Sequence, residues 1–353
     1  MWLLDNSTSF SADRTWVRDR NGAEVWVVGV KASFIVRSDG QQVLDPDQTK
    51  VLRVPEFLGP PEASSLLAES DLVHTKMATD VLVQGDAVAP GGRDAEVVDV
   101  RLRVATIDKT LRVHGDRVIK RGIVGLSLSR PEPFTRMPLT YERAFGGTDN
   151  TDANPKKHGW EPRNPVGTGF ATHEDHVVGE RAPNVEDPRS PYSGCQRGTP
   201  AGFGAIARHW APRVARAGTY GAEWEDTRRP LLPADFDERF YQCAPDDQQV
   251  AGGLTGGERV ELFNMTPEGY LAFQLPRVTL SFITQFYDGT EVTHRAALHT
   301  VVLQPATRRF QLVWHSALPC HRQVNKLAVT RVAVKKRINV PDRELASGTW
   351  IAE

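Results

Sequence analysis

The chain has 353 residues, and its 43 Lys and Arg side chains are nearly balanced by 44 Asp and Glu. The formal charge of −1 argues against a nucleic-acid-binding protein, which usually carries a basic excess. No apolar run approaches the roughly 20 residues of a transmembrane helix, and the N-terminus lacks the basic segment of a signal peptide. Three unevenly placed cysteines, Cys195, Cys243 and Cys320, do not form a disulfide framework. We therefore expect a soluble, cytoplasmic protein with no nucleic-acid or membrane partner.

The first part of the chain, residues 1–130, is predicted to be rich in β-strands. Asn21-Gly22 separates two strand-like runs and predicts a hairpin with a two-residue type I′ turn, in which both residues need a positive φ. Apolar side chains alternate from Trp26 to Val36, which predicts a half-buried strand. They alternate again from Val98 to Val104 with charged residues between them, which favours an antiparallel sheet with one solvated face.

The central part, residues 131–257, lacks strong periodicity. It is rich in Gly and Pro, which end strands and helices and mark turns. Its many aromatic residues are typical of an ordered loop assembly rather than of a disordered chain. Short helices are expected over residues 205–210, 212–216 and 233–239, the last with Pro at its start and acidic residues in its first turn.

Strand patterns return in the last part, residues 258–353. Apolar residues alternate over 271–275, 278–282 and 310–314, and a final strand is expected over 329–337. The sequence therefore predicts a mainly β protein. It would have antiparallel, sandwich-like sheets and a large irregular, loop-rich central region with a few short helices. We expect the parts 1–130, 131–257 and 258–353 to form one compact unit.

Acidic residues supply the candidates for catalysis. Glu142 and Arg143 precede the glycines of Phe145-Gly146-Gly147, where a catalytic Glu or a structural Glu142–Arg143 ion pair could lie; ion pairs are far commoner. Separately, two carboxyls from different acidic clusters could form the acid–base pair of a glycosidase; these clusters are Glu174-Asp175, Glu186-Asp187 and Asp235/Asp237/Glu238. The alternative hypothesis for the function is therefore a carbohydrate-active enzyme or a glycan-binding β protein. Substitution of Glu142 or Asp235 would test it.

No pattern of metal or cofactor ligands is evident. His173 and His176 are only three positions apart, and His294 and His299 lie in a strand-like segment, where a spacing of five places them on opposite faces. Adjacent Cys and His at 320–321 diverge on a strand, and the glycines of 252–257 have no following Lys for a phosphate loop. We expect no catalytic, metal-binding or cofactor-binding residues, and no cofactor.

Aromatic residues and arginine dominate binding hot spots, and the central part supplies several of both. They point to a binding or scaffolding role. Each aromatic could instead be buried inside the loop assembly, because large aromatic side chains are highly buried on average. The candidate partner-binding residues are Trp160, Arg163, Tyr192, Phe203, Trp210 and Trp224.

Several long motifs resemble those of one bacterial family, long catalogued only as a domain of unknown function. The resemblance covers nearly the whole chain, and the motifs occur in the expected order. They span residues 136–148 (RMPLTYERAFGGT), 159–169 (GWEPRNPVGTG), 200–210 (PAGFGAIARHW), 217–220, 232–240 and 244–249.

Genes of that family lie in type VI secretion clusters, beside those for the VgrG spike, PAAR-tip proteins and toxic effectors. The resemblance implies a cytoplasmic effector adaptor, or chaperone, that loads a cognate effector onto VgrG, with contact through the N-terminal or PAAR-bearing region of the effector. It implies no enzyme activity, and no catalytic or ligand residues are established for the family. A structural subunit of a larger β-assembly is a third reading.

Overall fold

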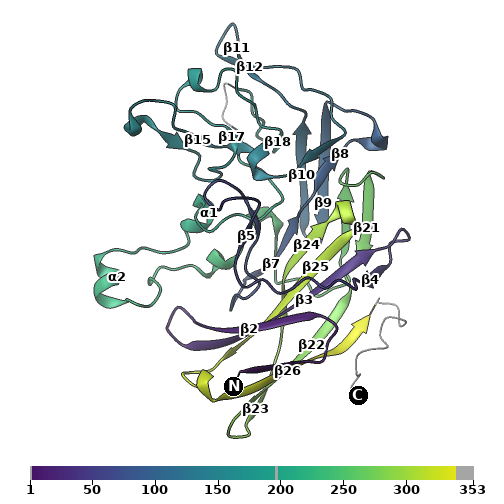
Figure 1. Ribbon diagram of the computed structural model, residues 1–353, viewed down its shortest axis with the longest axis vertical. Coiled ribbons are helices and arrows are strands. Elements are labelled where there is room, and N and C mark those ends of the chain that lie inside the picture. Colours follow the sequence, from purple (N-terminus) through teal and green to yellow (C-terminus); the bar gives the residue numbers. More distant parts are fainter. Residues whose placement is uncertain (1, 195–197, 339–353) are drawn as a thin grey trace.

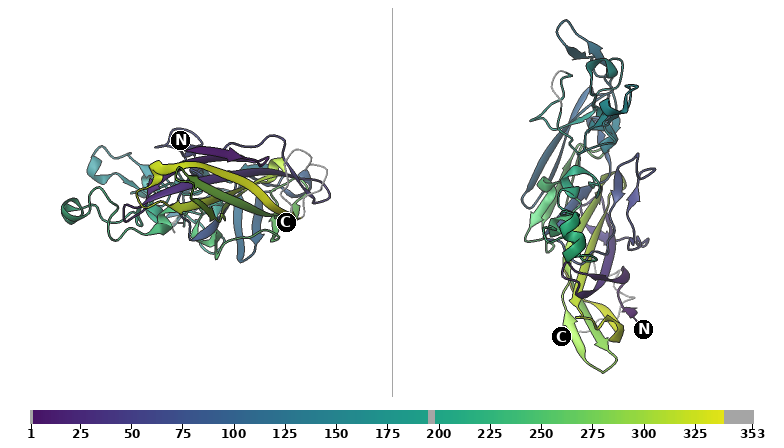
Figure 2. Two further views of the ribbon diagram at one scale, coloured as in Figure 1. Left: turned by 90° about the horizontal axis from the view of Figure 1, so that it is seen from below. Right: turned by 90° about the vertical axis from the view of Figure 1, so that its left-hand side faces the viewer.

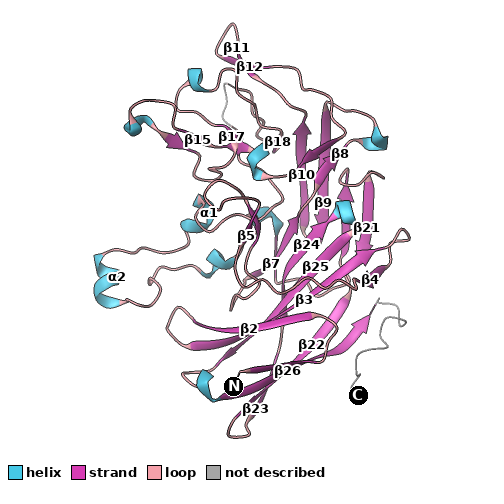
Figure 3. Cartoon of the chain, in the orientation of Figure 1, coloured by secondary structure: helices cyan, strands magenta, loops and turns pink. Residues whose placement is uncertain are grey.

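The computed structural model describes residues 2–194 and 198–338, so Cys195 lies outside the described residues. The fold is mainly β, with several antiparallel sheets and few short helices, which confirms the predicted fold class (Figure 3). The molecule is long and thin, and its N- and C-terminal strands lie together toward one end (Figure 1, Figure 2). Within the described ranges, no helix has the length and apolar character needed to cross a membrane.

The largest sheet has seven strands and combines the first and last parts of the chain with one short strand of the central part. Its neighbours are antiparallel except for β24 and β7, which are parallel. The strand order is β19 (Gln249–Ala251), β7 (Ala78–Val83), β24 (Ala297–Gln304), β25 (Arg309–Pro319), β3 (Glu24–Val36) and β2 (Ser11–Arg18), with β4 (Gln42–Leu44) also paired to β3.

Two further sheets pack against this one. The five-stranded sheet has the order β18 (Val185–Glu186), β10 (Ile107–His114), β9 (Val97–Val104), β20 (Arg259–Phe263) and β21 (Tyr270–Gln274). The four-stranded sheet has the order β1 (Leu3–Asn6), β26 (Leu327–Ile338), β22 (Arg277–Phe286) and β23 (Glu291–His294). Strand β9 alternates buried and exposed residues, as its sequence predicts, and its neighbour β10 does the same.

Short elements complete the chain. Two-stranded pairs are β5 (Glu56–Phe57) with β6 (Leu66–Ala68), β8 (Asp86–Val88) with β13 (Arg136–Pro138), β11 (Ile119–Arg121) with β12 (Leu126–Leu128), β14 (Phe145–Gly146) with β17 (Thr168–Gly169), and β15 (Thr148–Asp149) with β16 (Gly159–Trp160). The helices are α1 (Ala211–Val214) and α2 (Ala222–Thr227), and 3₁₀ turns lie at Pro90–Gly92, Tyr141–Arg143, Pro155–Lys157, Glu174–His176, Glu238–Tyr241, Asp246–Gln248, Pro305–Thr307 and Val324–Lys326.

The core lies where the three sheets meet. The ring of Phe310 stacks on Phe34 within the seven-stranded sheet and on Phe273 of the five-stranded sheet, with centroids 5.1 and 4.8 Å apart. At the other end of β3, the indole N–H of Trp26 donates to Thr330 Oγ1 of the four-stranded sheet at 2.9 Å. One face of the seven-stranded sheet therefore packs against both of the other sheets.

Strand β3 differs from its prediction, because both of its faces are covered. Its residues are almost all buried rather than alternately exposed. The apolar face contacts the other sheets, while the opposite face is covered by the segment between β4 and β7. On that face Lys31 Nζ forms a buried ion pair with Asp71 at 3.0 Å. The one charged residue between the apolar positions of β3, Lys31, is thus buried and paired, not solvated.

The β2–β3 hairpin is confirmed, but its predicted type I′ turn is wrong. Only Gly22 of the Asn21-Gly22 pair has a positive φ, at 82°. The loop is longer: Asp19 N–H donates to the Ala23 carbonyl at 2.9 Å, and the Asp19 carboxylate accepts from the backbone N–H groups of Asn21 and Ala23. The Asp19 side chain stabilises a wider loop that the Asn-Gly pattern alone does not predict.

The helices of the central part differ from their predicted positions. Residues 205–210 are not helical, and Ala205 bridges to Leu66 instead. The helix predicted over 212–216 corresponds to α1, and the one predicted over 233–239 is a 3₁₀ turn that begins at Glu238. Helix α2 was not predicted, although its residues include good helix formers and acidic residues near its start.

Candidate functional site

The most recognisable sequence motifs interlock in one buried assembly. Asn164 is fully buried, and its side-chain amide donates to the carbonyls of Tyr141 and Phe145 at 2.8 and 3.0 Å. Gly146 packs against the Asn164 backbone at a φ of 152°, where a Cβ would lie 2.1 Å from the Asn164 carbonyl oxygen. These contacts join the segments 136–148 and 159–169, so the motifs maintain a backbone arrangement.

The third motif, residues 200–210, packs onto the same assembly. The ring of Trp210 meets Tyr141 edge to face, with centroids 5.2 Å apart, and Trp210 and Phe203 have no exposed surface. Tyr192 is also buried and stacks on Phe145. Three of the predicted partner-binding residues, Tyr192, Phe203 and Trp210, are therefore interior packing residues, which matches the alternative that burial accounts for the aromatic content.

The carboxylate of Glu142 is held by another part of the chain. It accepts hydrogen bonds from the Ser65 backbone N–H and hydroxyl at 2.7 and 2.8 Å. The neighbouring Arg143 donates to Asp116 and Asn184, so the expected Glu142–Arg143 ion pair does not form within the described ranges. Glu142 connects the central motifs to the loop before β6.

Asp235, the second candidate carboxylate, closes a turn. It accepts from the backbone N–H and the hydroxyl of Thr219 at 2.9 and 2.8 Å. These hydrogen bonds, the backbone one first, lower the pKa of the Asp235 carboxyl. Both Glu142 and Asp235 thus have structural hydrogen-bond partners.

A narrow cleft of about 210 Å³ has a buried lysine at its wall. Lys109 Nζ donates to the Gly202 carbonyl, Asp247 and Gln248, each at 2.8 Å, and burial lowers the pKa of its ammonium group. Arg163 also lines this cleft, where its guanidinium forms a two-point ion pair with Glu161 at 2.6 and 2.8 Å. Because all three ammonium protons of Lys109 form hydrogen bonds, this side chain connects the five-stranded sheet to the loop assembly.

The described residues contain no group of three or more His, Cys, Asp or Glu side chains that could hold a metal ion. His294 and His299 do not share a strand: they lie in β23 and β24, in different sheets. Burial raises the pKa of the thiol of Cys243, to about 12, and of Cys320 beside His321. High thiol pKa values are those of unreactive, buried cysteines.

A projecting arm, residues 216–237, is the most prominent feature of the central part (Figure 1). Its base is closed by a hydrogen bond from the Asp237 N–H to the Arg216 carbonyl at 3.0 Å. Farther along, Arg228 donates to the Arg20 carbonyl, so the arm rests on the β2–β3 loop. Helix α2 forms its tip. Although it projects, the arm is held in place by hydrogen bonds at its base and side.

Aromatic side chains are exposed on this arm. Tyr220 is 55% exposed and meets Trp224 edge to face, with centroids 4.8 Å apart. The half-buried Trp224 donates its indole N–H to the Leu231 carbonyl at 2.7 Å, which orients its ring. Trp160, on the short strand β16, is 60% exposed. Of the six predicted contact residues, Trp160, Trp224 and the partly exposed Arg163 therefore reach the surface; Tyr220 was not among them.

A family model described as an uncharacterized protein conserved in bacteria, DUF2169, matches residues 21–315. The chain belongs to the DUF2169 family. The matched region of this DUF2169 protein includes the interlocked motifs, the arm and most of the seven-stranded sheet. No curated protein and no solved structure matches the chain.

Proposed function

We propose that this DUF2169 protein is a type VI secretion adaptor that binds a cognate effector in the cytoplasm and helps to load it onto the VgrG spike. Two kinds of support favour this role. The motifs resemble those of a family encoded beside VgrG, PAAR and effector genes, and the chain carries an arm with exposed aromatic side chains. The arm is the single observation that carries the proposal.

The arm suits a protein-binding surface because its exposed Tyr220 and half-buried Trp224 are already held in contact with each other. Tyr220 and Trp224 offer large contact areas with few rotatable bonds, so little side-chain entropy is lost on binding. The hydrogen bonds that close the arm at Arg216 and Asp237 limit its motion. A partner surface with an apolar cleft could bind the Tyr220–Trp224 pair without reorganising the adaptor.

Co-purification with the effector and VgrG encoded beside the gene tests this proposal. We expect a stable complex with the wild type, and at least tenfold weaker effector binding in a Tyr220→Ser variant. Tyr287→Ser is the matched control, because Tyr287 is 63% exposed but lies in the β22–β23 turn. Effector secretion that persists in a deletion strain would contradict the proposed function.

A further inference from the structure

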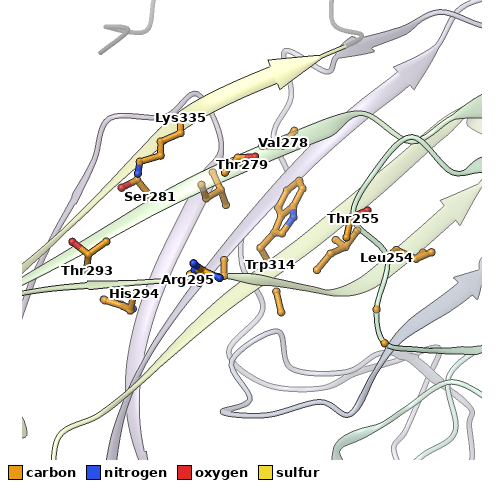
Figure 4. Close-up of a pocket in the computed structure, with 16 residues that line it drawn as sticks. Leu254, Thr255, Val278, Thr279, Ser281, Thr293, His294, Arg295, Trp314 and Lys335 are labelled. Carbon is orange, nitrogen blue, oxygen red and sulfur yellow. The ribbon is translucent and has the colours of Figure 1, made fainter. Parts of the chain in front are cut away.

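A groove of about 580 Å³ lies where the four-stranded and seven-stranded sheets diverge (Figure 4). One wall is the first half of β22, from Val278 to Ser281. The opposite wall is formed by Thr293–Leu298, where the chain leaves β23 for β24, and by the glycine-containing turn 252–255. We call this the edge groove. It is distinct from the arm and from the Lys109 cleft.

The edge groove exposes an unpaired strand edge. Strand β22 pairs with β26 along its whole length, from Arg277 to Phe286. Its other neighbour, β23, pairs only with Phe282–Gln285, and no other strand of the described chain pairs with β22. Alternate residues of Val278–Ser281 therefore direct backbone N–H and C=O groups toward the groove, as an edge strand does.

The open edge has the length of a short strand. At about 3.3 Å per residue, Val278–Ser281 extends roughly 13 Å, and strands have about three to ten residues. A segment placed there would continue the line of β23. It would replace water at the free backbone groups with ladder hydrogen bonds, which is how extended peptides add to exposed sheet edges.

The lining of the groove combines apolar, hydroxyl-bearing and basic side chains. Trp314, Leu298 and Leu280 are its apolar lining residues, with exposed fractions of 5, 6 and 8%, while Arg295 and Lys335 supply positive charge. No Asp or Glu is among the lining residues, and neither cation forms an ion pair with a described residue. A bound segment therefore gains from apolar side chains facing Trp314 and from a carboxylate near Arg295 or Lys335.

We propose that the edge groove accepts an extended segment of a partner polypeptide, with alternating apolar side chains and at least one Asp or Glu, as an added strand that pairs with β22 in line with β23. The inference rests on the proposed function in that the bound segment belongs to a protein partner. It deepens that function by stating what the partner presents: an acidic, strand-forming segment for the groove, in addition to a surface for the arm.

Selection from a displayed library of random heptapeptides, with the full chain as bait, tests the groove without knowledge of the natural partner. We expect enrichment of sequences with alternating apolar residues and an Asp or Glu. A synthetic copy of an enriched peptide should slow amide hydrogen exchange at Val278–Ser281. Enrichment of no sequence or of basic sequences, or protection elsewhere, overturns the proposal.

Charge reversal provides the second test. A variant with Arg295→Glu and Lys335→Glu should bind the enriched peptide at least tenfold more weakly. The control Lys120→Glu changes an exposed lysine of β11 and should leave binding unchanged. Equal binding by all three proteins overturns the proposal. So does binding that appears only after residues 339–353 are deleted, because the groove would then belong to the chain's own C-terminal segment.

The two proposals fail in different ways. If the protein co-purifies with effector and VgrG while no acidic peptide binds the edge groove, the groove inference fails and the adaptor function stands. If acidic peptides protect Val278–Ser281 while neither type VI protein co-purifies, the groove stands and the type VI assignment fails.

Discussion

At the scale of single residues, buried charges carry much of the specificity of the central fold. Arg213 is 2% exposed, and its guanidinium donates to Glu69 at 2.7 Å and to the carbonyls of Ile206 and Phe240. Burial alone would raise the pKa of the Glu69 carboxyl, but Arg213 and Arg208 outweigh that effect and hold the pKa below its usual value. The cluster connects the segments before β7 to α1 and the turn at Glu238–Tyr241.

Removing Arg213 should therefore be costly. We expect Arg213→Met to lower the free energy of unfolding by about 3 to 5 kcal/mol, because Glu69 would remain buried with less compensation. Urea unfolding followed by circular dichroism measures this. Arg189→Met is the control: Arg189 pairs with Asp187 but its side chain is 80% exposed, so the loss should stay below about 1 kcal/mol. Similar losses in the two variants would contradict the prediction.

A half-buried histidine makes stability depend on pH. His294 contacts Thr284 and Ser316 through its two ring nitrogens, and burial lowers its pKa to about 4. Below pH 6.5 the unfolded chain takes up a proton at this residue that the folded chain does not, so stability falls as the pH falls. Between pH 7 and pH 5 this group should account for about 2 kcal/mol.

The comparison of wild type with His294→Gln isolates that contribution, because the buried His299 and His315 are present in both proteins and contribute equally to each. The difference in unfolding free energy between pH 7 and pH 5 should be about 2 kcal/mol smaller in the variant. His209→Gln, at an exposed histidine, should keep the full wild-type difference. A variant that keeps the wild-type difference would show that His294 does not contribute.

The sequence predicted the environment of some individual residues correctly but not of others. An exposed Trp160 and a half-buried Trp224 are consistent with the predicted contact surface, but the same criterion selected Tyr192, Phe203 and Trp210, which are buried. Aromatic residues serve both cores and interfaces, and the sequence does not encode which partner covers a ring. Glu142 shows the same limit, because its partner Ser65 is 77 residues away.

At the scale of elements, the alternation of apolar and polar residues correctly predicted burial in strands that have one solvated face. It did not predict burial correctly in a strand that is covered on both faces. Strands β9 and β10 follow their pattern, whereas β3 buries Lys31 against Asp71, a contact that depends on a distant segment. Helix α2 is too short to give a clear periodic pattern. The edge groove has no sequence signature, since it depends on where β23 stops pairing with β22.

The interlocked motifs predict a sharp sensitivity at one glycine. A Cβ on Gly146 would lie 2.1 Å from the Asn164 carbonyl oxygen, at a backbone φ of 152°. We expect Gly146→Ala to lower the free energy of unfolding by at least about 3 kcal/mol, through the combined clash and strain. Gly179→Ala separates these effects, because Gly179 also has a positive φ but open space around it; about 1 kcal/mol is expected there. Equal losses of unfolding free energy at both positions would show that backbone strain alone causes the effect, without the clash.

At the scale of the whole molecule, the sheets bind the two ends of the chain together. Strand β3 lies between β2 and β25, β1 pairs with β26, and β9 pairs with β20. Each large sheet therefore needs strands from before residue 130 and after residue 257. The arm contributes no strand to any sheet and is closed at its own base.

This arrangement predicts opposite results for two deletions. A chain ending at residue 257 lacks β25, so β3 loses a neighbour on a strand that is buried on both faces; we expect it to be unfolded by circular dichroism and amide exchange. Replacing residues 219–235 by a short Gly-Ser linker should leave the wild-type spectrum, because Arg216 and Asp237 stay hydrogen-bonded, while binding of the effector is lost. An arm deletion that unfolds the protein would make the arm part of the core, and its exposed aromatics would then be poor evidence for a docking surface.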